Sequence, residues 1–352
     1  MRIDVEDVVR RAAKRAARYK FHRFHRVQAR RALQMLEGKS GRIDPRNLKL
    51  ADSYAREVFG SVHYAPWLRV YTAFCGTFKE GWIPDNYYGS VVVPNLKGGY
   101  GTLSSMKTVS RLIFGSEGFP DVGYFANGLF FSHDNVAVPP EKVRDVMFRD
   151  SDRIVFKLDG SAQGIGIFVY DRESFDIEAI RSLGNGVMQR FVDQHPTLAA
   201  FAPKSVATLR VTTAVDDAGV ISLRACFLRL GRANDTHVRA AGDVCVAVDL
   251  TTGQLGHEGY LNDWIAVTEH PDSHVPFAGT IVPSFKACIQ KALELHRKVP
   301  FARCVGWDFA VDVNGNVAVL EWNGGHNDVK FSEATQGPCF ADLKWERLNP
   351  AR

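Results

Sequence analysis

The most constraining feature of this sequence is a pair of alternating segments around Asn314-Gly315. The stretch at 306–323 reads GWDFAVDVNGNVAVLEWN. An Asn-Gly pair between alternating segments is the strongest short-range signal for a β-hairpin with a two-residue turn. The sequence therefore predicts two antiparallel strands in which two carboxylates face each other, with Cβ atoms roughly 4.5–5.5 Å apart. Counting outward from the turn gives three of the cross-strand pairs: Val313 with Asn316, Ala310 with Val319, and Asp308 with Glu321.

The two opposed carboxylates indicate a cation site. Like charges directly opposite each other are destabilising unless something neutralises them. Asn323 shares a face with Glu321, because side chains alternate along a strand. Carboxylate and amide oxygens suit Mg²⁺ or Mn²⁺ better than zinc. A solvated hairpin with two surface acids is the alternative, and apolar neighbours such as Trp307 and Trp322 argue against it. The predicted metal ligands are Asp308, Glu321 and Asn323.

A second hairpin, at 153–170, carries glycines in its turn. Backbone N–H groups in such a loop can cradle phosphate oxygens, and Lys157 adds a positive charge beside them. The loop lacks the GxxxxGK[ST] pattern of a P-loop, and a strand follows it where a dinucleotide fingerprint requires a helix. Glycine loops between strands are usually only turns, but together with the acidic hairpin this one predicts a nucleotide site. Lys107 is a second candidate for that site, although alone it reads as a surface lysine.

The order of elements indicates an α+β chain. Helices are expected at 4–37, near 46–60, at 104–114 and at 283–297 from helical spacing of apolar residues and from glycine stops. Short apolar runs bounded by Gly, Asp or Asn predict strands from about residue 120 onward. Strands mixed with a few helices are typical of the α+β class. The predicted strands are 128–132, 153–158, 165–170, 187–192, 206–215, 220–230, 244–250, 306–313 and 317–322.

Composition excludes several classes of protein. Apolar residues make up 45% and charged residues 24% of the 352 residues, which is ordinary for a folded globular chain and argues against disorder. No apolar run approaches the roughly 20 residues that span a bilayer, and the charged amino terminus does not resemble a secretory signal. We therefore expect a cytoplasmic protein. Six scattered cysteines without CxxC spacing are expected to be reduced thiols.

These motifs together resemble the ATP-grasp superfamily, and more narrowly its sugar-transfer-associated family. Asp308, Glu321 and Asn323 follow the Asp-x12-Glu-x-Asn metal pattern of those ligases. The resemblance covers roughly 100–340 and implies an ATP-grasp fold, in which two α+β subdomains grip ATP, preceded by a helical amino-terminal segment. The expected divisions are 1–90, a basic helical segment; 91–140, a pre-grasp region; 141–192, the subdomain with the phosphate loop; and 193–345, the subdomain with the metal hairpin. Further matching stretches are 205–211, 227–232, 248–253 and 270–272.

The resemblance also assigns roles to individual residues. Arg210 or Arg229 is expected to stabilise the transferred phosphoryl group, because Gly306 stands where many ATP-grasp ligases have an arginine. The acceptor substrate is expected near His326 and Gln336, although both could equally be ordinary loop residues. The residues expected to bind ATP are Lys107, Lys157, Gly160, Ser161, Gly164, Gly166, Gln189, Arg190 and Val192.

The implied reaction is ATP- and Mg²⁺-dependent joining of a carboxylate to an amine through an acyl phosphate. A small-molecule or glycan substrate with a carboxylate, such as a sugar acid or an amino acid, and an amine acceptor are the implied partners, in glycan or polysaccharide biosynthesis. One alternative is a kinase on the same scaffold that phosphorylates a hydroxyl. Another is a non-catalytic nucleotide-binding scaffold protein, against which the intact acidic triad argues.

Basic residues gather at the amino terminus. Residues 1–50 hold 15 Lys/Arg and five acids, whereas the remainder holds 29 basic and 34 acidic residues. The simpler interpretation of helix 1–37 is a solvated helix packed through its apolar stripe. The alternative is an arm that docks on an anionic membrane surface or an acidic glycan, since each basic residue near such a membrane contributes about 1 kcal/mol. The excess of acidic over basic residues in the rest of the chain argues against nucleic acid as a partner.

Overall fold

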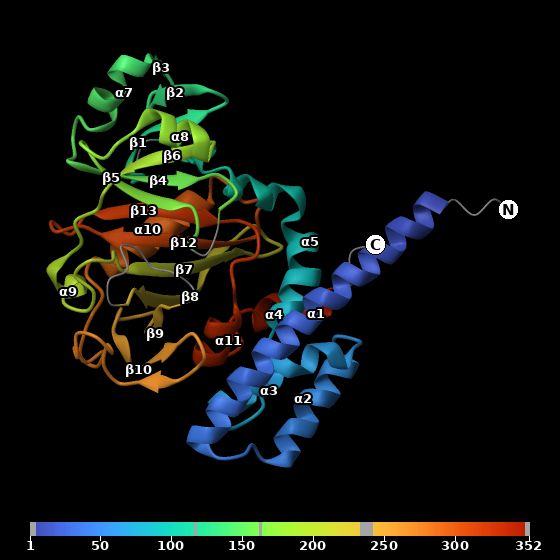
Figure 1. The fold of residues 1–352 in the computed structure, drawn as a ribbon. Helices are drawn as coiled ribbons and strands as arrows, with labels where there is room; N and C mark the ends of the chain where they lie inside the picture. Colours follow the sequence, from blue (N-terminus) through green and yellow to red (C-terminus); the bar gives the residue numbers. More distant parts are fainter. Residues whose placement is uncertain (1–4, 116–117, 162–163, 233–241, 349–352) are drawn as a thin grey trace. The chain divides into compact units, whose positions relative to one another are not determined.

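The computed structural model describes residues 5–115, 118–161, 164–232 and 242–348, and it divides into two compact units (Figure 1). Unit 1 is Met1–Asn95, Asp263–Ile265 and Asp328–Arg352, and unit 2 is Leu96–Asn262 and Ala266–Asn327. The expected α+β class with a helical segment before the sheets is confirmed. None of the described helices is long and apolar enough to cross a membrane.

Unit 1 is helical. Helices α1 and α2 both pack on α3, and α11, from the end of the chain, packs on the same helix. The chain leaves α1 at Gly41, whose φ of +83° suits glycine, and Asp44 caps α2 by accepting a hydrogen bond from Arg46 N at 2.8 Å. Gly38 lies inside α1, so it is not the stop that its residue type suggests. The helices are α1 (Val5–Ser40), α2 (Pro45–Glu57), α3 (Ala65–Cys75), α4 (Asp85–Tyr87), α5 (Val93–Leu96, at the unit boundary) and α11 (Lys330–Gln336).

A buried carboxylate explains why the end of the chain folds with its beginning. The carboxyl group of Glu333 in α11 accepts hydrogen bonds from Ile83 N at 2.7 Å and from Cys339 N at 2.9 Å. Trp82 donates its indole N–H to the Glu333 carbonyl at 2.8 Å. Buried polar groups of this kind must be satisfied, so these bonds hold α11 and the turn after it in unit 1.

Unit 2 contains two antiparallel sheets. The six-stranded sheet has the order β3-β2-β1-β6-β4-β5, and the seven-stranded sheet has the order β11-β10-β9-β8-β7-β12-β13. The strands of the first are β1 (Asp121–Ala126), β2 (Leu129–Ser132), β3 (Ala137–Val138), β4 (Arg153–Leu158), β5 (Ile167–Asp171) and β6 (Gly186–Arg190). Those of the second are β7 (Thr208–Val215), β8 (Ile221–Leu230), β9 (Val244–Val248), β10 (Leu255–Leu261), β11 (Ala266–Val267), β12 (Cys304–Val311) and β13 (Val317–Asn323).

Helices cover the sheets of unit 2. The apolar side of α10 (Phe285–His296) shares a core with β7, β8 and β12, and Figure 1 shows this helix lying along the seven-stranded sheet. The remaining helices are α6 (Ser110–Phe114), α7 (Pro140–Met147), α8 (Ile177–Leu183) and α9 (Pro196–Ala199). The helix expected at 104–114 is largely wrong, because 98–105 and 107–109 form 3₁₀ turns and only its last turn is α-helical. Strands β1, β3, β10 and β11 were not predicted.

The strand pairing of the acidic hairpin differs from the prediction at two points, and the two one-residue shifts cancel each other. The turn is a three-residue loop in which the Asp312 carboxylate accepts hydrogen bonds from Asn314 N and Asn316 N, at 2.9 and 2.8 Å. In the part of the hairpin next to the turn, the pairing is therefore shifted by one residue, and Ala310 pairs with Ala318. The predicted pairs of Ala310 with Val319 and of Val313 with Asn316 are wrong. An irregularity between Asp308 and Phe309 then restores the register.

That irregularity is a β-bulge at Leu320. Phe309 pairs with Val319 while Asp308 pairs with Glu321, so Leu320 is the extra residue. Bulges leave a residue out of the ladder and re-aim the side chains around it. The predicted opposition of Asp308 and Glu321 is thus correct, but it depends on the bulge.

Candidate functional site

The site begins with a buried ion pair between adjacent strands. Asp308 on β12 pairs with Arg210 on β7, and both side chains are buried. The guanidinium group holds the carboxylate through two hydrogen bonds, from Nε to Oδ1 and from Nη2 to Oδ2, the second at 2.9 Å. A third nitrogen, Nη1, donates to the Asn327 carbonyl at 3.2 Å. Such a two-bond pair fixes the direction of both groups.

The two carboxyl groups of the hairpin titrate in opposite directions. Burial raises the pKa of Asp308, but the Arg210 charge and its hydrogen bond outweigh burial and lower it overall. Burial, and after it the neighbouring Asp308 carboxylate, raise the pKa of Glu321. The charges of Lys157 and Lys107 partly offset the shift in the pKa of Glu321. The strands have therefore placed two acids and two lysines within electrostatic range of one another.

This donor set fits a hard divalent cation. A proton shared by two close carboxyl groups occupies the position that a cation would take, and a cation removes their repulsion. The amide N–H group of Asn323 donates to Gly306 O at 3.4 Å and to Asp308 Oδ2 at 3.5 Å, and its oxygen would complete the set once the amide turned over. The described residues contain no group of three His, Cys, Asp or Glu that could hold a metal, so the predicted site requires this amide. The three-ligand assignment stays a prediction.

Two residues from the other sheet contact the bulge. Lys157 on β4 and Gln189 on β6 both donate hydrogen bonds to the Leu320 carbonyl, each at 3.2 Å. Gln189 also donates to the Asp121 carboxylate at 2.8 Å, and burial raises the pKa of Asp121 to about 6. Burial lowers the pKa of Lys157, with Glu321 opposing that shift. The bulge leaves the Leu320 carbonyl out of the strand ladder, so this carbonyl can accept the hydrogen bond from Lys157. The bond links Lys157, the lysine predicted to bind phosphate, to the acidic hairpin.

The glycine loop is anchored at its start. Lys107 is buried and donates to the Ser161 carbonyl at 2.7 Å and to its hydroxyl at 3.2 Å. The Asp159 carboxylate accepts from Thr108 N and Thr108 Oγ1, and Gly160 N donates to the Ser105 carbonyl at 2.7 Å. Lys107 is thus placed beside the loop, as the nucleotide hypothesis requires, and is not a surface lysine.

Positive φ angles explain the three glycines of the loop. Gly160, Gly164 and Gly166 have φ of 69°, 78° and 75°, a region that side chains disfavour. At Gly166 an added Cβ would lie 2.9 Å from the Ser161 Cβ, so the loop also needs glycine for space. Residues 162–163 lie outside the described residues.

Arg229 is paired with a residue that sequence reasoning missed. It lies on β8 opposite Thr208, and its Nε donates to the buried Asp243 carboxylate at 2.7 Å. Burial lowers the pKa of Arg229, but Asp243 and Asp308 outweigh burial and raise it. Arg229 and Arg210 therefore share the acidic side of the sheet, although each has its own carboxylate partner. Their predicted catalytic roles stay predictions.

The segment after β6 joins the two sheets. Arg190 is exposed, while Val192 is buried. Arg190 N donates to the Pro120 carbonyl at 2.7 Å, and Val313 N donates to the Asp193 carbonyl at 2.9 Å. This is the position of a hinge between two sheets, and nothing in the structure tests the adenine contacts predicted for it.

The two predicted acceptor residues belong to different units. His326 is exposed in unit 2, and Gln336 ends α11 in unit 1. Lys97 is the nearby residue that the sequence analysis missed: it is 2% exposed and its ammonium group donates to Asn327 Oδ1 at 2.9 Å. Arg210 donates to the backbone carbonyl of Asn327, so Lys97 and the ion pair hold the same residue, one through its side chain and one through its backbone. Its position directly before the Gly98-Gly99 turn was the available signal.

Residues 179–343 match a family model described as sugar-transfer associated ATP-grasp. This segment is of the ATP-grasp type. The match confirms the resemblance found in the sequence, and it spans Gln189, Arg210, Arg229 and the acidic hairpin. Lys107 and Lys157 precede the matched segment, so their assignment rests on the contacts described above. A search of curated proteins found no match.

Several solved ATP-grasp proteins are similar in structure. A biotin carboxylase from Campylobacter jejuni, titled as a β,γ-ATP complex, is 9% identical, with a TM-score of 0.44 over 71% of this chain and 48% of that one. An L-amino acid ligase from Bacillus licheniformis is 12% identical, with a TM-score of 0.41 over 72% and 50%. A D-alanine-D-alanine ligase from Coxiella burnetii is 11% identical, with a TM-score of 0.39 over 70% and 58%. The chain spans about half the length of the first structures it matches, at 52%, 48% and 47%.

Proposed function

We propose that this chain is an ATP- and Mg²⁺-dependent ligase that joins a carboxylate to an amine. The observation that carries the proposal is the opposition of Asp308 and Glu321, within electrostatic range of Lys107 and Lys157. Phosphoryl transfer requires that the protein position its reactants and neutralise phosphate charge. This cluster offers both kinds of group in one place, with Asp308 and the two lysines buried and Glu321 half-buried.

The two lysines are the groups suited to phosphate oxygens. Each now donates to a neutral backbone carbonyl, Lys107 to that of Ser161 and Lys157 to that of Leu320. A charged phosphate oxygen is a stronger acceptor than a carbonyl, so ATP would displace these contacts. The acids and Asn323 would hold Mg²⁺, which when bound neutralises charge on the phosphates.

The proposed reaction has two steps. A carboxylate oxygen of the first substrate attacks the γ-phosphorus, the bond from that phosphorus to the bridging oxygen breaks, and ADP leaves. The amine nitrogen of the second substrate then attacks the acyl carbon, phosphate leaves with the former carboxylate oxygen, and the nitrogen loses a proton. Arg210 is the cation proposed for the transferred group, and in this structure it already fixes the direction of Asp308.

We propose a class of substrate by analogy with the family description. A sugar-transfer association makes a sugar acid, or an amino acid added to one, the carboxylate we propose, in the synthesis of a glycan. This is an analogy of fold and family, which can host several chemistries. No described contact distinguishes one sugar acid from another.

Product analysis tests the proposal. The full chain is incubated with ATP, Mg²⁺ and pooled sugar acids and amino acids, and products are identified by mass spectrometry together with ADP and free phosphate. A ligase releases phosphate only when carboxylate and amine are both present, and forms an amide. A phosphorylated hydroxyl product without an amide would show a kinase instead, and ATP binding without turnover in any pool would show a scaffold protein.

A further inference from the structure

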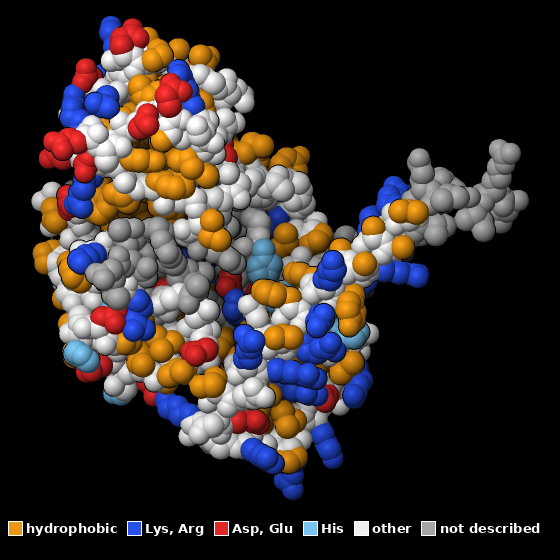
Figure 2. Space-filling model, in the orientation of Figure 1, with side chains coloured by type: hydrophobic (Ala, Val, Ile, Leu, Met, Phe, Trp, Pro, Cys, Tyr) orange, Lys and Arg blue, Asp and Glu red, His pale blue; other side chains and the backbone are white. Residues whose placement is uncertain are grey.

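Most of the length of α1 contains basic residues and no acid. From Val9 to Leu36 the helix contains ten Lys/Arg and no Asp or Glu. The described side chains from position 12 to position 20 are all exposed, so this part of the helix is not packed against the rest of unit 1. Figure 2 shows Lys and Arg side chains along α1 with apolar ones between them.

The charged and apolar side chains share one face. Residues three and four apart are neighbours on a helix, and the exposed outer side of α1 contains Lys20, Arg23, Phe24, Val27 and Arg31 at this spacing. Phe24 is 58% and Val27 is 44% exposed, and because they are three residues apart on the helix they lie side by side. The opposite side packs on unit 1 through the buried His25, Ala29, Ala32 and Leu36.

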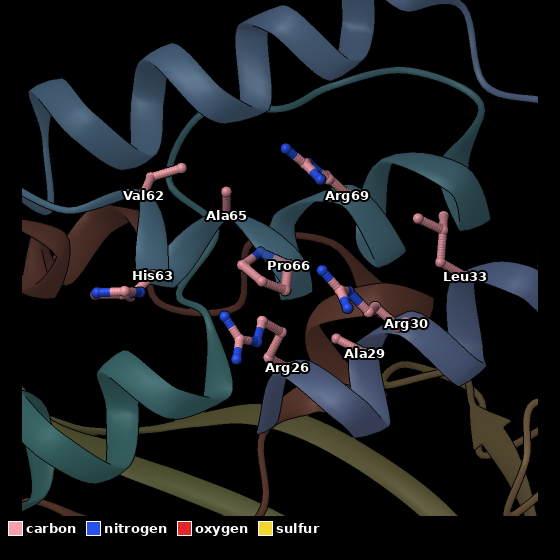
Figure 3. Close-up of a pocket in the computed structure, with 9 residues that line it drawn as sticks. All are labelled: Arg26, Ala29, Arg30, Leu33, Val62, His63, Ala65, Pro66 and Arg69. Carbon is pink, nitrogen blue, oxygen red and sulfur yellow. The ribbon is translucent and has the colours of Figure 1, made fainter. Parts of the chain in front are cut away.

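A groove beside this face adds unpaired cations. It has a volume of roughly 240 Å³ and a floor that includes Ala29 and Pro66, and Figure 3 shows Arg26, Arg30 and Arg69 around Pro66. Arg69 is neutralised by Asp52, which accepts two hydrogen bonds from it at 2.8 and 2.7 Å. Within the described part of the chain, neither Arg26 nor Arg30 forms an ion pair.

We infer that this face of α1 is a docking surface for an anionic lipid membrane. Helices that lie in a membrane interface combine Lys and Arg, which bind anionic headgroups, with aromatic and aliphatic side chains that enter the boundary of the acyl chains. Lys20, Arg23 and Arg31 supply the charge, and Phe24 and Val27 the insertion. The groove between Arg26 and Arg30 receives one lipid phosphate. The exposed apolar pair favours lipid over nucleic acid, because phosphate backbones offer no apolar layer.

Sedimentation of the full chain with vesicles tests this inference. Vesicles of neutral phosphatidylcholine are compared with vesicles that also contain phosphatidylglycerol, at low and high salt. We expect sedimentation only with the anionic vesicles and its loss at high salt, because salt screens exposed charges beyond about 10 Å at 0.1 M. No sedimentation with anionic vesicles at low salt overturns the inference.

Two sets of substitutions locate the surface. The triple variant Lys20→Gln, Arg23→Gln, Arg31→Gln should bind about 100-fold more weakly, at roughly fivefold per basic residue. Its matched control changes three exposed basic residues at and before α2 in the same unit: Arg42→Gln, Arg46→Gln and Lys49→Gln. All six are exposed, so equal melting temperatures are expected. Equal weakening by the two triple variants would overturn the assignment to α1.

Substitution of the apolar pair, Phe24 and Val27, tests whether the surface binds a membrane or another polyanion. Phe24→Ser with Val27→Ser should weaken vesicle binding several-fold without changing charge, and Leu50→Ser, at a residue 52% exposed on α2, is the control. Binding to duplex DNA is measured in parallel. If the apolar variant binds vesicles as the wild type does, and DNA competes fully with vesicles, then α1 is a nucleic-acid surface and the membrane inference is wrong.

Discussion

Replacing Glu321 by Gln isolates the charge of the proposed metal ligand. The side chain keeps its size, so the hairpin and the Leu320 bulge should remain. At neutral pH the wild-type carboxylate is unfavourable without a cation, because burial and Asp308 raise its pKa. A carboxyl group with a raised pKa in the folded state stabilises below its unfolded pKa, and that contribution is lost as pH rises through the folded value. Without Mg²⁺, Glu321→Gln should therefore melt higher than the wild type at pH 7 and equally near pH 4.

Adding Mg²⁺ should reverse the order of the two melting temperatures, so that the wild type melts higher than Glu321→Gln. A ligand at 100 times its Kd stabilises the folded state by about 2.7 kcal/mol, which corresponds to a rise in Tm on the order of 5–10 °C for a unit of this size. Wild type should show that rise on adding Mg²⁺ with ADP, and Glu321→Gln should lose most of it. Activity should fall by about 10²-fold or more, since the ligand acts at the phosphoryl transfer.

Differential scanning calorimetry with and without Mg²⁺ and ADP is the assay. Glu173→Gln is the matched control, because Glu173 is an exposed acid of unit 2 away from the hairpin. A Glu321→Gln variant that keeps the full Mg²⁺-dependent rise in Tm, and wild-type turnover at low Mg²⁺, would refute the metal assignment.

Three further results are expected. Arg210→Ala should lower the free energy of unfolding by about 3–5 kcal/mol in urea, because Asp308 would be left charged and buried, and a loss below 1 kcal/mol would contradict the buried pair. Burial lowers the pKa of Lys97 to about 8. Between about pH 8 and 10.5 only the unfolded state keeps this proton, so the stability of the wild type, measured as the urea midpoint, should rise with pH. Lys97→Met should abolish that rise. Hydrogen exchange at 159–166 should slow when ATP and Mg²⁺ bind, and unchanged exchange with nucleotide bound would contradict a phosphate-covering loop.

Prediction from sequence succeeded where the signal was local. The glycine stop after α1, at Gly41, and most strand positions follow from backbone preferences of a few residues. The helix predicted at 104–114 failed because residues 98–105 and 107–109 form 3₁₀ turns, and Gly101 in the first of them lies against the Gly324 backbone, far away in sequence. Strand β10, with its Gly-His-Glu-Gly sequence, lacks a strand pattern and exists because β9 and β11 pair with it.

The sequence by itself determined that a hairpin around Asn314-Gly315 would place Asp308 and Glu321 on neighbouring strands, because residue types and strand periodicity are local properties. It could not determine that a three-residue loop and a bulge at Leu320 would produce this pairing together. Only the tertiary structure decided that Arg210 would neutralise Asp308, that Lys157 would reach the bulge carbonyl, and that Glu333 would fix the end of the chain in unit 1. These contacts join residues 98, 163 and 250 positions apart, and their strength comes from burial, which no local pattern specifies.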